Sequence, residues 1–267
     1  TGATVIDASG TKDGGSILVG GDYQGKNSDI QNAENTTIEE DVTLKADSLI
    51  DGDGGKIIVW SDGTTRFHGS ILARAVGLNG NGGFAEISGK QHLVIDLLNI
   101  DLSSQAGLSG TLLLDPANII ISDGVGAAIT DSESNTNLTD GQIQDFLVGD
   151  TANLLIQATS NIDINNDVSI VWGTARSLTF DAGGDITFQV GGGAILDGQT
   201  AGADLIFNAD DNISLASASF GLAASVTTIE LNVGQGGGGG TLDLGSAVFQ
   251  AEDTVNLTGG AGTDTLI

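Results

Sequence analysis

The last nine residues of the chain have the residue types and the spacing of a calcium-binding turn. Residues 259–267 read Gly-Gly-Ala-Gly-Thr-Asp-Thr-Leu-Ile and match the pattern Gly-Gly-x-Gly-x-Asp-x-Φ-x, in which Φ is apolar. In this pattern, carbonyls of the glycine-rich turn and the aspartate carboxylate supply the hard oxygen ligands that Ca²⁺ prefers. We therefore predict Gly260, Gly262 and Asp264 as candidate calcium ligands. A complete site needs consecutive repeats and only one is present, so an ordinary glycine-rich corner is the alternative.

Carboxylates and basic side chains gather between residues 51 and 92, and enzymes that cleave polysaccharides use these residue types. Such enzymes need an acid and a base on one face, or a base beside bound Ca²⁺. No spacing places this group on one face, and no nucleophile, phosphate-loop or zinc pattern accompanies it. We therefore predict a protein that is not an enzyme, with polysaccharide cleavage as the alternative. The group comprises Asp51, Asp53, Asp62, Arg66, His68, Arg74 and His92.

Two tryptophans are candidate ligand contacts. Trp60 and Trp172 each follow an Ile-Val pair, and the alternation of a strand places at least one of them outward. An exposed indole can stack on a sugar ring. Partial burial at the edge of a coil is the alternative for both residues.

Composition limits the elements that can position these side chains. The 267 residues include 42 glycines but one proline, no cysteine and no methionine. Each interior glycine costs a helix about 1 kcal/mol relative to alanine, which excludes helical bundles. Collagen requires abundant proline, and a chain that is 39% hydrophobic and 16% charged is not disordered. The formal charge of −27 makes nucleic acid an unsuitable partner.

Three segments align without a gap and define a repeat. Residues 154–164, 178–188 and 205–215 share the pattern Leu-x-Φ-[Gln/Asp/Asn]-Ala-x-x-[Asn/Asp]-Ile-x-Φ. Weaker copies run over 247–257, through Phe249, Ala251, Val255 and Leu257, and over 112–121. Within each copy, apolar and polar residues alternate on both sides of a turn-forming pair, which is typical of two short strands that meet at a corner.

A unit of two short strands buries too little apolar surface to fold alone, so it must stack on its neighbours. We therefore predict an all-β parallel β-helix, with Gly-Gly corners before strands at residues 14, 54 and 82. A sandwich or barrel is the alternative, although hairpins would then link its strands. A cap-type Thr or Asp ahead of Ile143, Phe146 and Leu147 predicts a short helical insertion over 139–147. The glycine run at 236–240 predicts a flexible corner or a domain break near 234–240.

Residues 7–122 resemble the filamentous-haemagglutinin-like exoproteins of Gram-negative two-partner secretion systems. The likeness is densest in three stretches: 54–74 (GGKIIVWSDGTTRFHGSILAR), 82–90 (GGFAEISGK) and 110–121 (GTLLLDPANIII). The resemblance implies a right-handed parallel β-helix that an outer-membrane transporter exports to the cell surface or the medium. We accordingly expect a haemagglutinin-like region over 1–122 and a repeat region over 123–267 that continues the same solenoid.

The expected function is that of a structural or adhesive segment of a large secreted bacterial surface protein. Its expected partners are surface glycans or proteins of host or neighbouring cells, because a solenoid presents a long face with many weak contacts. A calcium-dependent glycan-binding module is a further alternative. The ends of a solenoid are open strand edges, so copies are expected to stack end to end into a filament. The chain begins at Thr1 and has no match to the family's secretion domain, which suggests an internal fragment.

Overall fold

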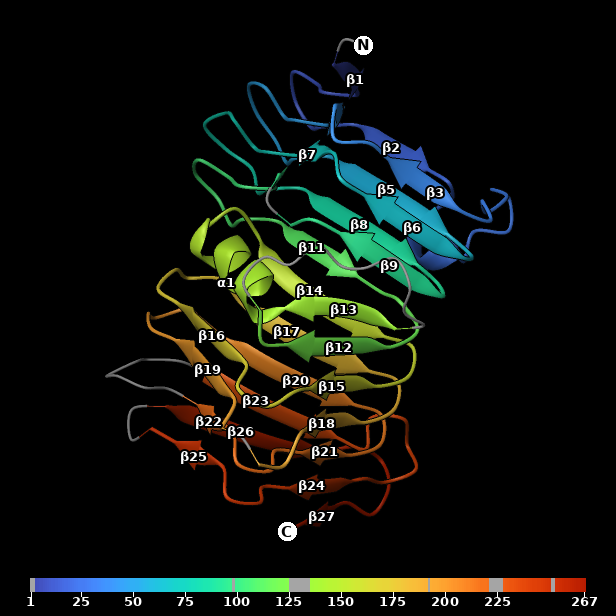
Figure 1. The fold of residues 1–267 in the computed structure, drawn as a ribbon. Coiled ribbons are helices and arrows are strands. Elements are labelled where there is room, and N and C mark those ends of the chain that lie inside the picture. Colours follow the sequence, from blue (N-terminus) through green and yellow to red (C-terminus); the bar gives the residue numbers. More distant parts are fainter. Residues whose placement is uncertain (1–2, 98, 125–134, 192, 221–227, 251–252) are drawn as a thin grey trace. The chain divides into compact units, whose positions relative to one another are not determined.

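The computed structural model describes residues 3–97, 99–124, 135–191, 193–220, 228–250 and 253–267. Of these residues, those up to Pro116 together with 149–154 form one compact unit, and the rest form a second. We call them unit 1 and unit 2. In each unit the chain winds in coils, and successive coils add parallel strands to three sheets (Figure 1). This confirms the predicted parallel β-helix. No helix among the described residues has the length and apolar character needed to cross a membrane.

The described residues of unit 1 contribute four, four and three strands to three parallel sheets. The first sheet orders β1 (Thr4–Asp7), β4 (Val42–Lys45), β7 (Ser70–Leu72) and β10 (Ile100–Asp101). In the second sheet lie β2 (Ser16–Val19), β5 (Lys56–Ser61), β8 (Phe84–Gly89) and β11 (Thr111–Leu114). The third contains β3 (Thr36–Ile38), β6 (Thr64–Phe67) and β9 (His92–Ile95). The short helical turn η1 (Tyr23–Gly25) lies in the connection from β2 to β3.

Unit 2 repeats the plan with one insertion. Its first sheet orders β14 (Asn153–Ala158), β17 (Leu178–Ala182), β20 (Leu205–Ala209), β23 (Thr228–Val233) and β26 (Thr254–Gly259). The second runs through β13 (Thr136–Thr139), β12 (Ile119–Ser122), β15 (Ile162–Ile164), β18 (Ile186–Phe188), β21 (Ile213–Ser214), β24 (Thr241–Asp243) and β27 (Thr265–Leu266). The third contains β16 (Ser169–Trp172), β19 (Ile195–Gly198), β22 (Ser219–Phe220) and β25 (Val248–Phe249).

The gapless alignment of the repeats is also the register of the sheets. Leu178 lies opposite Leu205, and Ile186 lies opposite both Ile162 and Ile213. Identical inward positions therefore stack from coil to coil, as the repeat predicted. The weaker copy over 112–121 also fits this register, because Ile119 and Ile121 pair with Ile162 and Ile164.

The copy predicted over 247–257 is wrong in register. Val255 lies opposite Ile229 in the first sheet, whereas Phe249 lies opposite Phe220 in the third. Ala251 of this copy lies outside the described residues. The strand that continues the repeat is β23, and the glycine-rich connection from β23 to β24 breaks the repeat spacing that would have revealed it.

Aromatic rings stack in the core of unit 2. Phe180 and Phe207 lie parallel with ring centroids 5.2 Å apart, and Phe220 packs edge-on against Phe207 at 5.9 Å. Phe180, Phe207 and Phe220 are fully buried. Such offset and edge-to-face pairs add stabilisation beyond the apolar area they bury.

The Gly-Gly corners of unit 1 occur where neighbouring coils approach closely. A Cβ atom at Gly54 would collide with the backbone of Ala73 and Gly83 in the next coil. One at Gly14 would collide with Ala46 and Gly55 in the same way. The glycines are therefore required by the spacing of the coils, as the sequence suggested.

The predicted insertion is helix α1 (Asp140–Val148), which lies beside the edge strand β16 (Figure 1). Thr139 and Gln142 form a capping box: the Thr139 N–H donates to the Gln142 side chain (3.0 Å) and the Gln142 N–H donates to Thr139 Oγ1 (3.2 Å). The side chains of Asp140 and Gln144 accept the N–H groups of Ser169 and Val171, each at 2.8 Å. The helix thus satisfies the open edge of β16.

Candidate functional site

The outward face of the second sheet of unit 1 is covered by a segment of the chain itself. Residues 20–33 leave β2, fold back over this face and return to β3; we call this segment the strap. Its two ends meet, since the Ala33 N–H donates to the Gly20 carbonyl at 2.7 Å. A compact surface loop with adjoining ends is a common way to place functional groups on a rigid scaffold.

The indole of Trp60 lies between the sheet and the strap. Trp60 is 3% exposed, and a Cβ atom at Gly25 would lie 2.6 Å from two atoms of its indole. The backbone at Gly25 has φ +61°, a conformation that favours glycine. The absence of a side chain also lets the strap backbone lie directly on the indole ring. Asp62 Oδ1 accepts hydrogen bonds from the indole N–H (3.4 Å) and from the Asn32 amide (3.0 Å).

Two buried carboxylates lie under the strap beside this indole. Glu86 projects from the middle of β8 and is 0% exposed, and Asp115 follows β11 and is 8% exposed. The Gln24 backbone N–H donates to both carboxylate oxygens of Glu86, at 3.1 and 3.0 Å. The Gln24 side-chain amide donates to Asp115 Oδ2 at 3.0 Å. One strap residue therefore serves both carboxylates.

The surroundings of Glu86 favour its neutral form. Burial raises the pKa of Glu86 to about 7, and the nearby Asp115 carboxylate adds to the increase. Hydrogen bonds from Gln24 and Ser88 and the charge of Lys56 oppose it. A carboxyl group that titrates near neutrality can take up or release a proton at ordinary pH.

The rim of the strap is charged and aromatic. Lys56 Nζ lies 3.2 Å from Asp22 Oδ1 and 5.5 Å from the centre of the Tyr23 ring. Hydrogen bonds from the Asn27 amide and the Tyr23 N–H, together with Lys56, lower the pKa of Asp22 to about 2. The Tyr23 ring packs on Phe84 at 5.9 Å. This rim holds one end of the strap on β5 and β8.

The groups under the strap could bind a ligand chiefly by accepting hydrogen bonds from it. Two carboxylates and an indole face would suit a ligand with several N–H or O–H donors, and in this structure Gln24 supplies those donors. The strap excludes any other ligand while it lies in place.

The sequence did not single out Gln24, Glu86 or Asp115. A signal was nevertheless present in β5, where Ile57 to Trp60 form a continuous apolar run instead of alternating with polar residues. Such a run is typical of a strand buried on both faces. It predicts a cover on the outward face but does not identify the segment that supplies it.

The two predicted ligand-contact tryptophans are both buried. Trp60 is covered by the strap, and Trp172 is 1% exposed and donates its indole N–H to the Arg176 carbonyl at 2.9 Å. Neither ring offers a face on which a sugar could stack in this conformation.

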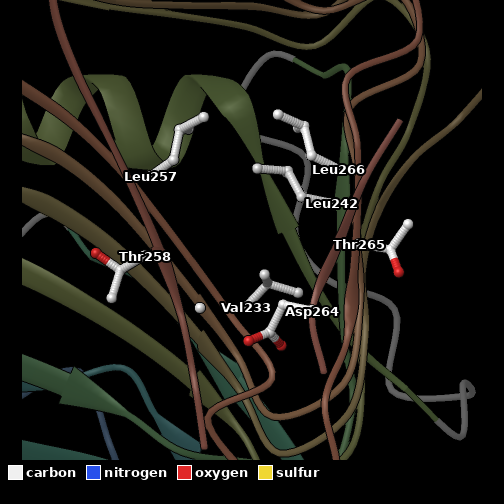
Figure 2. Close-up of a pocket in the computed structure, with 8 residues that line it drawn as sticks. Val233, Leu242, Leu257, Thr258, Asp264, Thr265 and Leu266 are labelled. Atoms are coloured by element: carbon white, nitrogen blue, oxygen red, sulfur yellow. The ribbon is translucent and has the colours of Figure 1, made fainter. Parts of the chain in front are cut away.

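The predicted calcium residues lie at the C-terminal end of unit 2. Asp264 Oδ1 accepts the Gly240 N–H at 2.9 Å, and the Gly260 N–H donates to the Val233 carbonyl at 2.9 Å. Asp264 also lines a hollow of about 130 Å³ beside apolar side chains, which Figure 2 shows. Among the described residues, no three His, Cys, Asp or Glu side chains form a cluster able to hold a metal ion. The Asp264 carboxylate thus joins the corners of two successive coils.

Three of the residues considered for catalysis, Asp51, Asp53 and Arg74, have separate structural partners. Asp51 accepts from the Asn79 amide (2.9 Å), and Asp53 accepts the Asn81 N–H (2.7 Å). Arg74 makes a two-point contact with the buried Asp47, at 2.7 and 3.2 Å, and the pairing raises the pKa of Arg74. The remaining members of the group are Asp62 under the strap, Arg66 in β6, His68 after β6, and His92 in β9.

Comparison of the chain with known protein families and with curated protein sequences found no match.

Proposed function

We propose that this chain is a structural and adhesive segment of a large secreted bacterial surface protein, of the filamentous-haemagglutinin-like kind. The observation that carries the proposal is the use of outward polar side chains in unit 2. They form hydrogen bonds with the side chain or backbone of the equivalent residue in the next coil and line up in rows along the sheets, instead of converging on one pocket. A repeated polar face is the form of a binding surface with many weak contacts.

Two rows of side chains illustrate this use. In the first, the Gln157 amide donates to Asp181 (2.9 Å) and the Asn232 amide donates to Asn208 (2.8 Å). In the second, Asn161 Oδ1 accepts the Asp185 N–H (2.9 Å), Asp185 Oδ1 accepts the Asn212 N–H (3.0 Å), and Asn212 Oδ1 accepts the Thr241 N–H (2.8 Å). The hydrogen bonds of the second row lie at the exposed surface of unit 2, where the amides and carboxylates can be reached from solution.

The adhesive part of the proposal predicts binding by avidity. We would couple the purified chain to beads at high density and measure retention on arrays of cell-surface glycans and on whole cells. Multivalent beads should bind at least about a hundredfold more tightly than the free chain. Beads carrying a heat-denatured chain are the control. The absence of binding by dense beads would contradict adhesion, and new reducing ends in a polysaccharide substrate would favour the enzymatic alternative.

The proposal includes association of copies end to end, with a second copy of this chain as the occupant of the terminal hollow. Among the described residues, β26 and β27 are the last strands of their sheets, and Leu257 and Leu266 are 47% and 60% exposed beside them. An unpaired strand edge next to apolar side chains is a template for another strand. Surface export would proceed through an outer-membrane transporter before such association.

Light scattering after size-exclusion chromatography tests the association, with and without added Ca²⁺. The mass should rise with protein concentration, and Leu266→Asp should keep the chain monomeric. Val190→Asp is the matched control, because Val190 is an exposed apolar residue (85%) between β18 and β19. A monomer at all concentrations, or equal effects of the two substitutions, would contradict end-to-end association.

A further inference from the structure

We propose that the strap over residues 20–33 is a pH-dependent cover, which lies on the outward face of unit 1 while Glu86 is protonated and lifts as Glu86 ionises. This inference goes beyond the proposed function and does not depend on it. It rests on the arrangement of one fully buried carboxyl group, its neighbours and the segment that covers it.

The strap is a discrete element of the connection between β2 and β3. It starts after β2 and ends before β3, and the Gly20 to Ala33 hydrogen bond closes its base. Away from this base, polar contacts join it to the sheet: Gln24 to Glu86 and Asp115, Asn32 to Asp62, and Asp22 to Lys56. Gln24 holds its position with φ +52°, a left-handed conformation that non-glycine residues adopt rarely. The strap therefore has a strained contact at its centre and a base that can act as a hinge.

Glu86 faces charged groups from every element packed on it. Lys56 of β5 is the nearest cation of the sheet, and Asp115 after β11 is an anion. From the strap, Asp22 pairs with Lys56, while Lys26 Nζ contacts Gln24 Oε1 at 2.6 Å instead of either buried carboxylate. The Tyr23 ring lies over Lys56. Ionised Glu86 therefore adds a second negative charge beside Asp115 in a place that water does not reach.

The direction of the pH effect follows from the two positions of the strap. With the strap closed, the pKa of Glu86 is about 7, and with the strap lifted the carboxyl group meets water and returns toward its ordinary value of 4.5. The closed form consequently binds more protons between these values, so rising pH favours the lifted form. From pH 5.5 to 7.5 this linkage increases the ratio of lifted to closed strap about twentyfold. Lifting exposes Trp60 and both carboxylates to solution.

Amide hydrogen exchange of the whole chain, followed by mass spectrometry of peptides, tests the proposal. After correction for the intrinsic exchange rates, protection in peptides from residues 20–33 should fall about twentyfold between pH 5.5 and 7.5. Peptides from β17 and β20 in unit 2 provide the internal control and should keep their protection. Equal protection of the strap at both pH values would overturn the proposal.

Glu86→Gln removes the titration while keeping the shape of a neutral carboxyl group. The strap should then keep the same protection at both pH values, and an unchanged pH response in this variant would overturn the proposal. If Glu86→Gln fails to fold, Asp115→Asn supplies the second arm. Removing the neighbouring charge lowers the pKa of Glu86 in the closed form, so the loss of strap protection should level off at a lower pH and be smaller. A response identical to that of the wild-type chain would contradict the role of the carboxylate pair.

Discussion

The two units build the same sheet in different ways. In unit 1, five of the six residues of both β5 and β8 are buried, because the core covers one face and the strap region covers the other. In unit 2, β14, β17, β20 and β23 alternate between buried and half-buried residues. The outward face is thus closed in unit 1 and open in unit 2, although both belong to parallel coils.

The two units provide hydrogen-bond partners for outward polar side chains in two different ways. Unit 2 joins the amides and carboxylates at equivalent positions of successive coils, which requires a polar side chain at that position in each repeat. The covered face of unit 1 instead joins unlike residues across long sequence separations, as Gln24 does with Asp115. Regular repeats therefore accompany the open face, and irregular coils accompany the covered one. Each unit contains one of the two tryptophans. The Trp172→Phe background keeps Trp60, whose fluorescence reports on unit 1. The Trp60→Phe background keeps Trp172, whose fluorescence reports on unit 2.

The largest expected effect is loss of the aromatic stack in unit 2. Phe207→Ala removes a fully buried ring that contacts Phe180, Phe188 and Phe220. The free energy of unfolding should fall by about 4 kcal/mol in denaturant titrations of the Trp60→Phe background. Ile206→Ala is the control on the half-buried outward side, with an expected loss of about 1 kcal/mol. Equal losses would show that the inward stack does not hold the coils.

The next effect is a pH dependence confined to unit 1. Because the folded pKa of Glu86 is about 7 and its ordinary value is 4.5, the folded form takes up the extra proton, and stability falls as pH rises between these values. In the Trp172→Phe background, the wild-type chain should lose about 3 kcal/mol relative to Glu86→Gln between about pH 4 and about pH 8. A constant difference between the two chains would refute this account of the covered face.

A smaller effect is expected from the ion pair at the corner of unit 1. Asp47 is 1% exposed and accepts from the backbone N–H and the guanidinium of Arg74. Asp47→Ala should cost about 2 kcal/mol in denaturant titrations, because it takes the buried acceptor away from the part-buried donors of Arg74. Asp101→Ala, which removes a partly exposed carboxylate 3.8 Å from Arg74, should cost less than about 1 kcal/mol. The reverse order would be inconsistent with burial as the source of the effect.

The smallest effect belongs to the open face of unit 2. Asn212→Ala removes a donor to Asp185 and an acceptor for the Thr241 N–H, both at 2.8 Å. The expected loss of unfolding free energy is about 1 kcal/mol, since the row is exposed to water. Asn256→Ala on the exposed strand β26 should change stability by less than about 0.5 kcal/mol. If the two substitutions cost the same, the row does not stabilise the coils.

The sequence predicts the fold of unit 2 in more detail than that of unit 1. Leu205, Phe207 and Ala209 repeat the inward positions of 178–182, so one pattern gives the strand, its face and its register. Where the corner length changes, as between β23 and β24, the register is lost although the alternation of Ile229 and Leu231 remains. Sequence periodicity identifies neighbouring strands only while the length of the coil is constant.

The candidate site is harder to predict for a physical reason. Gln24 and Asp115 are 91 residues apart, and no repeat links them. Alternation in Phe84 to Gly89 marks Glu86 as outward, and an outward glutamate is ordinarily solvated. Its burial depends on where the strap folds, and that position is set by Gly25 on the Trp60 ring and by Asn32 on Asp62. None of these contacts follows from local propensity.

The contrast between a covered and an open sheet face can be measured directly by carboxyl labelling. Glu86 and Glu230 occupy equivalent outward positions, in β8 under the strap and in β23 on the open face. We would treat the folded chain at mildly acidic pH with a carbodiimide and an amine, and then quantify each modified residue by mass spectrometry. We expect Glu230 to be labelled while Glu86 stays unmodified until the chain is denatured. Labelling of Glu86 as fast as Glu230 would contradict the covered face of unit 1.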